Sequence, residues 1–471
     1  MSLFEHQVVA TLATHSLFAF GKPIHVARAP GRLDVMGGNV DYTGGSVLQS
    51  LLGEAIWGAA QPRTDGLIRI LNPGAAQFGW EPCLEASTAV LNDLQELQQR
   101  CGQREGSRWF GYVLGALYFL KQNVDSDLMG GIDIFIASNL PPNKGVSSSA
   151  ALEIATLKAA SAAYGTSLEG VALATAGQWV ENVVVGSACG IMDQAAIVLG
   201  QENYLLPILC QPCLPNALVK LPAGLSIWGI DSMVSRSTTG IAYETARAAA
   251  FIGYKLICQH ERIEITSEDF SGIPRFTDSR WNGYLSNLAP SEFRSRYERL
   301  LPESLSGREF FERSEEHVDP FTVVNLDRQY PVRAAVRYAT EENFRVQILN
   351  TLLKTVSPDG SHSLLKLIGE LLCQSHAAYA ECGLGSEACD ELVSRALKAG
   401  FPGAKMTGGG AGGVVAILGR SGPETRRAIQ DIAQQYGADR YAMPYIFDGS
   451  SNGVDAFGVR CVQLGLFQGA R

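Results

Sequence analysis

The sequence predicts an α+β protein of two domains, and three observations support this. The chain has 471 residues, which is more than one ordinary hydrophobic core organises. Residues 24–29 and 132–136 alternate between apolar and polar side chains, as half-buried strands do. The alanine- and leucine-rich run after Ser147 reaches Gly165 and has the composition of a helix with serines at its start and a glycine at its end.

Further elements follow from the same kinds of signal. The Pro30–Gly31 pair is predicted to end the first strand and to open a glycine-rich loop. A helix is predicted over 171–185, because Gly186 follows it directly. Residues 361–400 have a helical pattern, and the apolar run 414–418 predicts a buried strand.

The proline density sets the predicted division of the chain. It rises around 207–222, and we place the domain boundary there. We therefore expect an N-terminal domain over 1–215, which holds most of the candidate site residues, and a C-terminal domain over 216–471. Residues 259–320 are charged, aromatic and irregular, and they are predicted to be a segment inserted into the second domain.

The composition describes a soluble globular protein, with 46% hydrophobic and 18% charged residues. Its net charge of −9 argues against a nucleic-acid partner, since no basic field would offset phosphate repulsion. No apolar run reaches the roughly 18 residues of a membrane span, so no membrane partner is expected. Ten cysteines without regular spacing fit reduced thiols and a cytoplasmic location. The Cys210–Cys213 pair lacks the further ligands that a metal site needs.

The most informative motif lies between the strand at 132–136 and the helix after Ser147. A helix start presents free N–H groups and the positive end of the helix dipole, so it binds anions. The candidate phosphate-binding residues are Asn143, Lys144, Gly145, Val146, Ser147, Ser148 and Ser149. An ordinary serine N-cap is the alternative. The loop is not of the GxxxxGK[ST] type, because its lysine precedes the glycine.

Three more motifs combine glycines with polar residues. The loop within 30–45 carries an arginine and two carboxylates, and a tight surface turn is the alternative. Asp193, in the segment 189–194, is a candidate base or metal ligand, or else a solvated aspartate. Residues 405–413 contain GxGxxG, but a strand follows them, so a dinucleotide-binding loop is rejected. A backbone that passes close to a ligand or to another loop is expected instead.

Taken in order, these motifs resemble those of one known family. The patterns PGRxxxxGxxxDYxGG, GVSSSA, GIMDQ and KMTGGGxGG resemble the GHMP kinase superfamily and, within it, the galactokinase family. The resemblance implies a two-domain GHMP kinase fold. Its N-terminal domain would be ribosomal-protein-S5-like, its C-terminal domain ferredoxin-like, and its active site would lie in the cleft between them.

The resemblance also implies roles for individual residues. Asp193 would be the base or charge partner of the attacking anomeric hydroxyl, and Arg32 would lie beside it. Ser149 and Glu181 would hold Mg²⁺, while the amides of 144–149 would cradle the phosphates of ATP. The sugar pocket would be lined by Asp41, Gly190 and Tyr243.

Several segments further resemble the kinase part of the plant L-arabinokinases; they are Gly283–Asn287, Leu301–Ser304, Tyr330–Arg333 and Glu342–Val346. Galactokinases carry Glu-His where this chain has Gly38 and Asn39, and those two residues are associated with the 6-hydroxyl of the sugar. L-arabinose lacks that CH₂OH group, so a site for it can drop the acid and the imidazole. Gly38 and Asn39 are therefore expected at the substrate, and the loss of the Glu side chain is expected to create room.

The resemblance thus implies an ATP- and Mg²⁺-dependent sugar 1-kinase that converts L-arabinose to L-arabinose 1-phosphate. Galactokinase activity is the alternative, and a non-catalytic galactokinase-like sugar sensor is a second one. The complete serine loop and Asp193 favour an enzyme over a sensor. We expect a monosaccharide and ATP as ligands, and a monomer or a weak homodimer.

Overall fold

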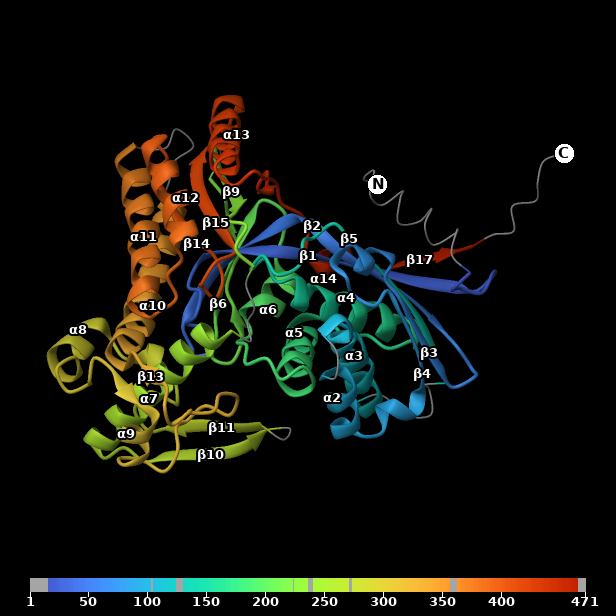
Figure 1. The fold of residues 1–471 in the computed structure, drawn as a ribbon, viewed down its shortest axis with the longest axis horizontal. Helices are drawn as coiled ribbons and strands as arrows, with labels where there is room; N and C mark the ends of the chain where they lie inside the picture. Colours follow the sequence, from blue (N-terminus) through green and yellow to red (C-terminus); the bar gives the residue numbers. More distant parts are fainter. Residues whose placement is uncertain are drawn as a thin grey trace.

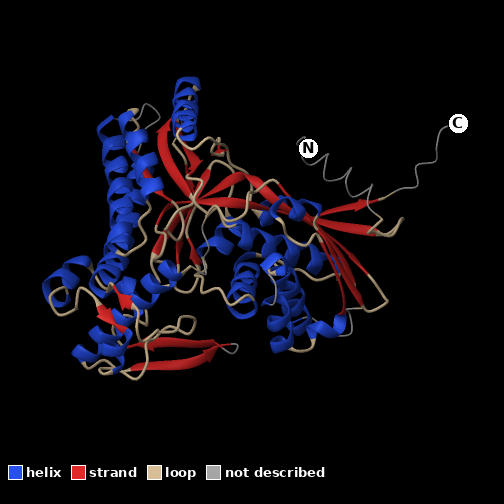
Figure 2. Cartoon of the chain, in the orientation of Figure 1, coloured by secondary structure: helices blue, strands red, loops and turns tan. Residues whose placement is uncertain are grey.

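The computed structural model describes residues 16–464, except 103–104, 124–129, 223, 236–239, 271–272 and 356–361. It contains two main sheets with helices on either side of the strands that cross the middle of the molecule (Figures 1 and 2). Within the described part of the chain, no helix is both long and apolar enough to cross a membrane.

The larger sheet has the strand order β17-β1-β2-β5-β3-β4, and β6 extends it beside β2 with the short strands β7 and β8. Its pairs are antiparallel except for β3 with β5. The strands are β1 (Pro23–Met36), β2 (Ser46–Pro62), β3 (Leu67–Leu71), β4 (Cys83–Ser87), β5 (Ile132–Ser138), β6 (Tyr204–Leu209), β7 (Leu214–Pro215), β8 (Val219–Lys220) and β17 (Arg460–Gln463).

Helices pack against one face of this sheet and carry the serine motif. The helix α4 is buried along almost its whole length and lies against β1 and β2, as expected of a helix that is apolar on all sides. The helices of this part are α2 (Leu94–Gly102), α3 (Phe110–Asn123), α4 (Ser148–Ala163), α5 (Gly170–Trp179) and α6 (Met192–Leu199). α4 ends just before Gly165, as predicted. The predicted helix over 171–185 is α5 followed by a π-helical turn, Val180–Val184.

The second sheet has the order β14-β15-β9-β16 and is antiparallel. Its strands are β9 (Leu225–Asp231), β14 (Gly403–Met406), β15 (Val414–Arg420) and β16 (Ile446–Phe447). The helices of this part are α7 (Ile241–Glu261), α10 (Val332–Thr355), α11 (His362–Glu381), α12 (Glu387–Lys398), α13 (Pro423–Ala438) and the short α14 (Val454–Phe457), which packs back on α6 and β1. The helical pattern predicted for 361–400 is confirmed by α11 and α12, while residue 361 lies outside the described residues, and the predicted strand at 414–418 lies within β15.

The segment predicted as an irregular insertion has a core of its own. The hairpin β10 (Ile265–Phe270) and β11 (Ile273–Asp278), the pair β12 (Leu305–Ser306) and β13 (Gln329–Tyr330), and the short helices α8 (Pro290–Glu292) and α9 (Gly307–Phe311) lie here. Buried side chains such as Trp281, Phe293 and Phe310 pack with α7 and α10. In Figure 1 this part lies at the lower left, below α10 and α11.

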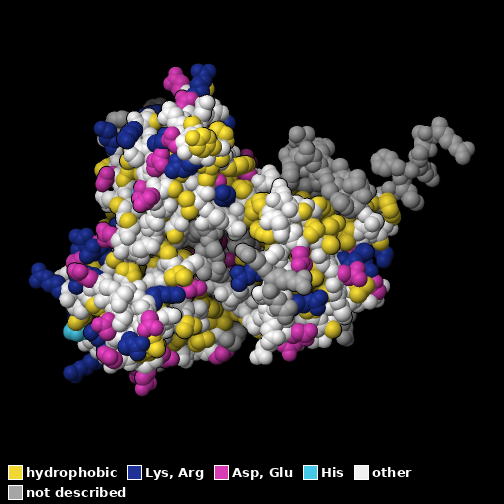
Figure 3. Space-filling model, in the orientation of Figure 1, with side chains coloured by type: hydrophobic (Ala, Val, Ile, Leu, Met, Phe, Trp, Pro, Cys, Tyr) yellow, Lys and Arg dark blue, Asp and Glu magenta, His cyan; other side chains and the backbone are white. Residues whose placement is uncertain are grey.

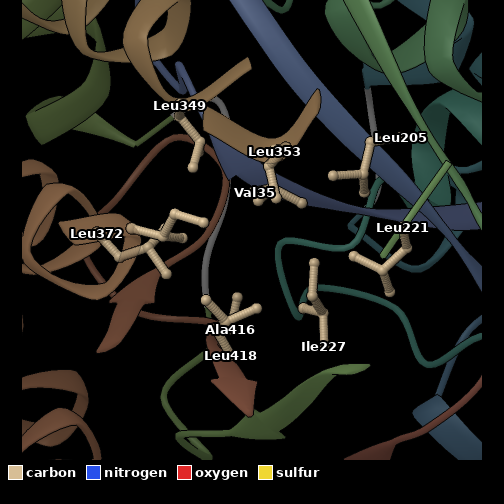
Figure 4. A pocket seen from close by; sticks show the side chains of 10 residues that line it. Val35, Leu205, Leu221, Ile227, Leu349, Leu353, Leu372, Ala416 and Leu418 are labelled. Carbon is tan, nitrogen blue, oxygen red and sulfur yellow. The ribbon is translucent and has the colours of Figure 1, made fainter. Parts of the chain in front are cut away.

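An apolar cavity of about 10 Å³ lies where the two sheets meet α10 and α11 (Figure 4). It is lined by Val35, Leu205, Leu221, Ile227, Leu349, Leu353, Ile368, Leu372, Ala416 and Leu418. A water molecule in this cavity would have no polar side-chain partner, because all ten lining residues are apolar. The cavity is a packing gap between the two parts of the chain and carries no chemistry.

Two features differ from the predictions. The first strand does not end at Pro30 but continues to Met36, with a register shift between Pro30 and Arg32. A bulge tolerates proline, because the residue there leaves a ladder hydrogen bond unmade. The chain also crosses between the two parts more than once, since β17 pairs with β1 although it lies far beyond residue 215.

Candidate active site

The start of α4 is not capped by the side chain of the residue before it. Ser147 precedes the helix with φ 62° and ψ 43°, and its side chain makes no capping hydrogen bond. Its Oγ is buried and has no hydrogen-bond partner among the described residues. The ordinary N-cap interpretation is therefore wrong for Ser147. A buried hydroxyl without a partner, beside N–H groups that no helical carbonyl satisfies, is suited to an anion.

Arg32 joins this loop to Asp193. On β1, Arg32 donates through Nε and Nη2 to Asp193 Oδ1, at 2.8 Å and 2.6 Å. Its Nη1 donates to the Gly145 carbonyl at 2.7 Å. Arg32 is 1% exposed, whereas the Asp193 side chain, in the first turn of α6, is 18% exposed. The structure thus places the predicted pair together, with the carboxylate open to a ligand and the arginine fixed behind it.

Glu181 lies in the π-helical turn that follows α5, a kind of irregularity that is frequent at functional sites. Burial and then the charge of Asp193 raise the pKa of Glu181 to about 7, while a hydrogen bond from Ser149 opposes the shift. Gln194 Nε2 donates to Glu181 Oε2 at 2.8 Å. The Ser149 hydroxyl and the Glu181 carboxylate are thus in contact at the start of α4, and they are the oxygen ligands that Mg²⁺ prefers.

Sequence reasoning missed a second carboxyl group in this network. Glu153 is fully buried one turn into α4, and burial, followed by the charge of Glu181, raises its pKa well above the usual value. Gln194 Nε2 also donates to its Oε2, at 3.3 Å. Burial of Glu153 therefore favours its protonated form. A single glutamate in an alanine-rich helix gave no signal of such a role.

Asp41 and Gly190 meet beside Asp193. A Cβ on Gly190 would lie 1.9 Å from Asp41 Oδ2, so only glycine leaves room for that carboxylate. Burial and then the charge of Asp193 raise the pKa of Asp41 to about 6, against the lowering effect of Arg247. Tyr243, on α7, packs edge-on against Tyr42 with ring centroids 5.9 Å apart. The three residues predicted to line a sugar pocket thus lie in one region.

Gly38 and Asn39 differ in their surroundings. A Cβ on Gly38 would lie 2.2 Å from the Tyr379 hydroxyl and 2.5 Å from the Gly408 carbonyl oxygen. The expectation that the missing side chain creates room is therefore wrong, because Tyr379 and the glycine-rich loop fill that space. Asn39 is 3% exposed and has φ 62°, and neither Nδ2 nor Oδ1 has a partner among the described residues. A buried amide without partners is costly, and a bound ligand could supply the missing hydrogen bonds.

The glycine-rich loop after β14 packs against the loop that precedes α4. It joins two antiparallel strands, which confirms that it is not a dinucleotide-binding loop. A Cβ on Gly413 would lie 2.7 Å from the Lys144 carbonyl oxygen. Lys144 Nζ forms an ion pair with Asp231 Oδ2 at 2.8 Å. Of the two partners left open by the sequence, the loop therefore approaches another loop, and it links the second sheet to the start of α4.

A cleft of about 490 Å³ is lined by Arg32, Asp193 and residues of the loop before α4, and Figure 3 shows a hollow near the centre of the face drawn, on which basic and acidic side chains are interspersed. The residues predicted to bind the sugar, Asp41, Gly190 and Tyr243, are not among its lining residues. The lining of the cleft includes the serines of the loop as well as three aromatic residues, Trp80, Trp109 and Tyr112. The cleft can hold a ligand that has both an anionic group and a planar ring. The sequence alone predicted no role for these three aromatic residues.

The uncapped helix start, the arginine–aspartate pair and two sheets of this topology together indicate the GHMP kinase fold. Residues 111–201 match the GHMP kinases N terminal domain, and residues 361–439 match the GHMP kinases C terminal domain. Residues 18–62 match the galactokinase galactose-binding signature. The chain belongs to the GHMP kinase superfamily.

Among curated proteins, the chain is 34% identical to the L-arabinokinase of Arabidopsis thaliana over 95% of its own length. It spans 47% of that relative, about half of the plant protein. The sequence homology is thus to a sugar kinase of the arabinokinase and galactokinase type.

Solved structures confirm the fold. Galactokinase of Lactococcus lactis, in complex with galactose, matches with a TM-score of 0.72 at 21% identity, over 97% of this chain and all of that one. Mevalonate kinase of Methanococcus jannaschii matches with a TM-score of 0.55 at 14% identity, over 90% of this chain and 98% of the other. At these identities the likeness extends to the fold alone.

Proposed function

We propose that the protein transfers the γ-phosphoryl group of ATP to the anomeric hydroxyl of a monosaccharide, with L-arabinose as the preferred substrate and L-arabinose 1-phosphate as the product. The observation that carries this proposal is the contact of Arg32 with both Asp193 and the Gly145 carbonyl. It sets a carboxylate, which can act on a hydroxyl, directly beside an anion-binding helix start. The 34% identity to the plant L-arabinokinase supports the choice of sugar.

In the proposed reaction, the sugar lies between Asp41 and Asp193, and its anomeric hydroxyl faces Asp193. The Asp193 carboxylate accepts the proton of that hydroxyl, or it stabilises the positive charge that develops on the hydroxyl as its oxygen attacks phosphorus. Arg32 holds Asp193 in place and offsets negative charge on the transferring group, while the amides of 144–149 bind the phosphates. Mg²⁺, when bound through Ser149 and Glu181, would neutralise the phosphate oxygens. Phosphoryl transfer depends mainly on such positioning and charge stabilisation.

The proposal is tested by steady-state kinetics of ADP release with L-arabinose, galactose and glucuronate. We expect the highest kcat/KM with L-arabinose, residual turnover of galactose and none of glucuronate. A kcat/KM for galactose equal to or above that for L-arabinose would refute the assignment to a pentose. In that case the galactokinase alternative would stand, which the match to the galactose-binding signature favours. Absence of turnover with every pentose and hexose would favour the sugar sensor.

The proposed metal ligands are tested by titrating Mg²⁺ at fixed ATP. Replacing Ser149 with alanine or Glu181 with glutamine is expected to raise the half-activating Mg²⁺ concentration at least 10-fold, because each removes one oxygen ligand. Glu153→Gln is the matched control. It changes a buried glutamate that accepts from the same Gln194 amide, but Glu153 is not a proposed metal ligand, so the Mg²⁺ requirement should stay that of the wild type. Equal Mg²⁺ curves for all four proteins would contradict the metal assignment.

Location and assembly complete the proposal. All ten cysteines are free thiols, which supports a place in the cytoplasm. We further propose that the protein acts as a monomer or weak homodimer without a nucleic-acid or membrane partner, which sedimentation of the purified protein and binding assays with DNA and lipid vesicles would test.

A further inference from the structure

A buried arginine on α7 lies beside the proposed sugar pocket, and none of the steps above uses it. Arg247 is 3% exposed, and its guanidinium lies over the ring of Tyr42, with 4.9 Å from its Cζ to the ring centroid. Its positive charge lowers the pKa of both Asp41 and Tyr243, although burial raises each of them more strongly. Arg247 is therefore close to two of the three residues that were assigned to the sugar pocket from the sequence.

Two of its three guanidinium nitrogens are held by the segment that follows α9. Nε and Nη2 donate to the two carboxylate oxygens of Asp319, at 2.7 Å and 2.8 Å. Thr322 also donates to Asp319, through Oγ1 at 2.7 Å. The Asp319 side chain is fully buried. This bidentate geometry orients the guanidinium plane, because the fork of an arginine matches a carboxylate edge to edge.

The third nitrogen is the one that points to a ligand. Nη1 of Arg247 is buried and makes no hydrogen bond of normal geometry to a described residue, although the Tyr243 hydroxyl lies nearby. A buried, charged donor left in this way is costly unless something accepts from it. Asn39, two residues before Asp41, has the same deficit in both amide atoms. Two buried polar side chains without a full set of partners thus belong to the residues associated with the sugar pocket.

We propose that Arg247 is a substrate-binding residue, whose Nη1 donates to a ring or hydroxyl oxygen of the sugar, and that Asp319 positions it. This assignment rests on the proposed function. It also gives a role to the segment around 259–320, whose last residues supply Asp319.

The charge of the site identifies the class of sugar. The Asp319 carboxylate already balances Arg247 through two hydrogen bonds, and Asp41 and Asp193 bring two further carboxylates. Among the described residues, the two arginines beside the pocket, Arg247 and Arg32, are already bound to Asp319 and Asp193. Neither is therefore a free cation for the carboxylate of an anionic sugar. Because the charge of Arg247 is balanced by Asp319, its Nη1 offers a hydrogen bond but no net positive charge to a ligand. The ligand is therefore an uncharged monosaccharide.

A double variant separates sugar binding from a purely structural role. Arg247→Met alone would leave Asp319 buried without a counter-ion, which is strongly destabilising. Arg247→Met combined with Asp319→Asn removes both charges and keeps an oxygen that accepts from Thr322. Replacing a buried ion pair by neutral side chains is often close to neutral in stability. We therefore expect near-wild-type thermal unfolding, a KM for L-arabinose raised at least 10-fold and a KM for ATP within twofold of the wild type.

Monodeoxy analogues of L-arabinose locate the contact. With the wild type, one analogue should have a lower kcat/KM than L-arabinose. With the double variant, that analogue and L-arabinose should have the same kcat/KM, because removing the hydroxyl and removing Arg247 abolish the same hydrogen bond. Arg280→Gln, an exposed ion-pair arginine in the same segment, is the control and should change neither KM. Arg247→Lys provides a second test that keeps the charge, and its KM for L-arabinose should also rise, since lysine lacks the fork.

A KM for L-arabinose that stays at the wild-type value in the folded double variant overturns the inference. If that variant does not fold, an unchanged KM in Arg247→Lys overturns it instead. Parallel increases in the KM for sugar and for ATP would also contradict it, since they would show a general distortion of the cleft. If the wild type itself phosphorylates no monosaccharide, the proposed function fails, and that outcome is visible before any variant is made.

Discussion

Replacing Asp193 with asparagine is expected to lower kcat about 1000-fold, which is within the usual range for loss of a catalytic base. Asparagine keeps an oxygen that accepts from Arg32, so the hydrogen bonds at 2.8 Å and 2.6 Å have a replacement acceptor. Asparagine cannot take a proton from the sugar hydroxyl, and it has no negative charge to stabilise positive charge that develops on that hydroxyl. The KM for the sugar should change by less than about 10-fold, because the effect acts on the transition state.

The kinetic measurement needs a check that the variant is folded and binds its ligands. Calorimetric binding of L-arabinose to the Asp193→Asn protein should remain measurable. Asp327→Asn, an exposed aspartate in another part of the chain with 83% of its side chain exposed, is the control and should keep the wild-type kcat. A kcat for Asp193→Asn within 10-fold of the wild type would contradict the role proposed for Asp193.

Asp41→Asn is expected to weaken the sugar complex while it stabilises the free protein. A carboxylate that accepts from sugar hydroxyls makes charge-assisted hydrogen bonds, each worth about 1.5–3 kcal/mol. Loss of these bonds should raise the KM for L-arabinose about 100-fold. In the free protein, however, the same carboxylate is buried, with its pKa raised to about 6 from 3.8. Its ionisation therefore opposes folding by about 3 kcal/mol at pH 8.

The sign of the stability change depends on pH. Between about pH 4 and pH 6, the folded protein retains a proton on Asp41 that the unfolded chain releases, so the wild type loses stability as the pH rises through this window. Asparagine has no such titration. Thermal or urea unfolding should show the two proteins nearly equal near pH 4, with the variant more stable by about 2–3 kcal/mol at pH 8. A variant less stable than the wild type at pH 8 would show that Asp41 supports the fold rather than the ligand.

The order of the motifs made much of the site predictable. Arg32 and Asp193 are 161 residues apart in the sequence, yet each lies in a motif whose glycines and polar residues marked it, and the structure joins them. The helix after Ser147 and the buried strand at 414–418 were likewise visible in local composition. These features depend on neighbours in the chain, which the sequence displays directly.

Other residues depend on contacts that no local pattern records. Arg247 is one cationic residue in an alanine-rich helix, and its importance appears only when Asp319 and Tyr42 are placed against it. The space at Gly38 is filled by Tyr379, which lies 341 positions later in the chain. The first strand continues past Pro30 because β2 pairs with it on both sides of a bulge. Long-range packing decided each of these outcomes.

The most direct test of the account is ³¹P and ¹H NMR of the wild-type protein incubated with L-arabinose, ATP and Mg²⁺. The account predicts one new phosphomonoester resonance, coupled to the anomeric proton of the sugar and formed in equal amount with ADP. A phosphate on any other hydroxyl, or no new phosphomonoester with L-arabinose while ATP stays intact, would contradict phosphoryl transfer to the anomeric position by the Asp193 and Arg32 pair.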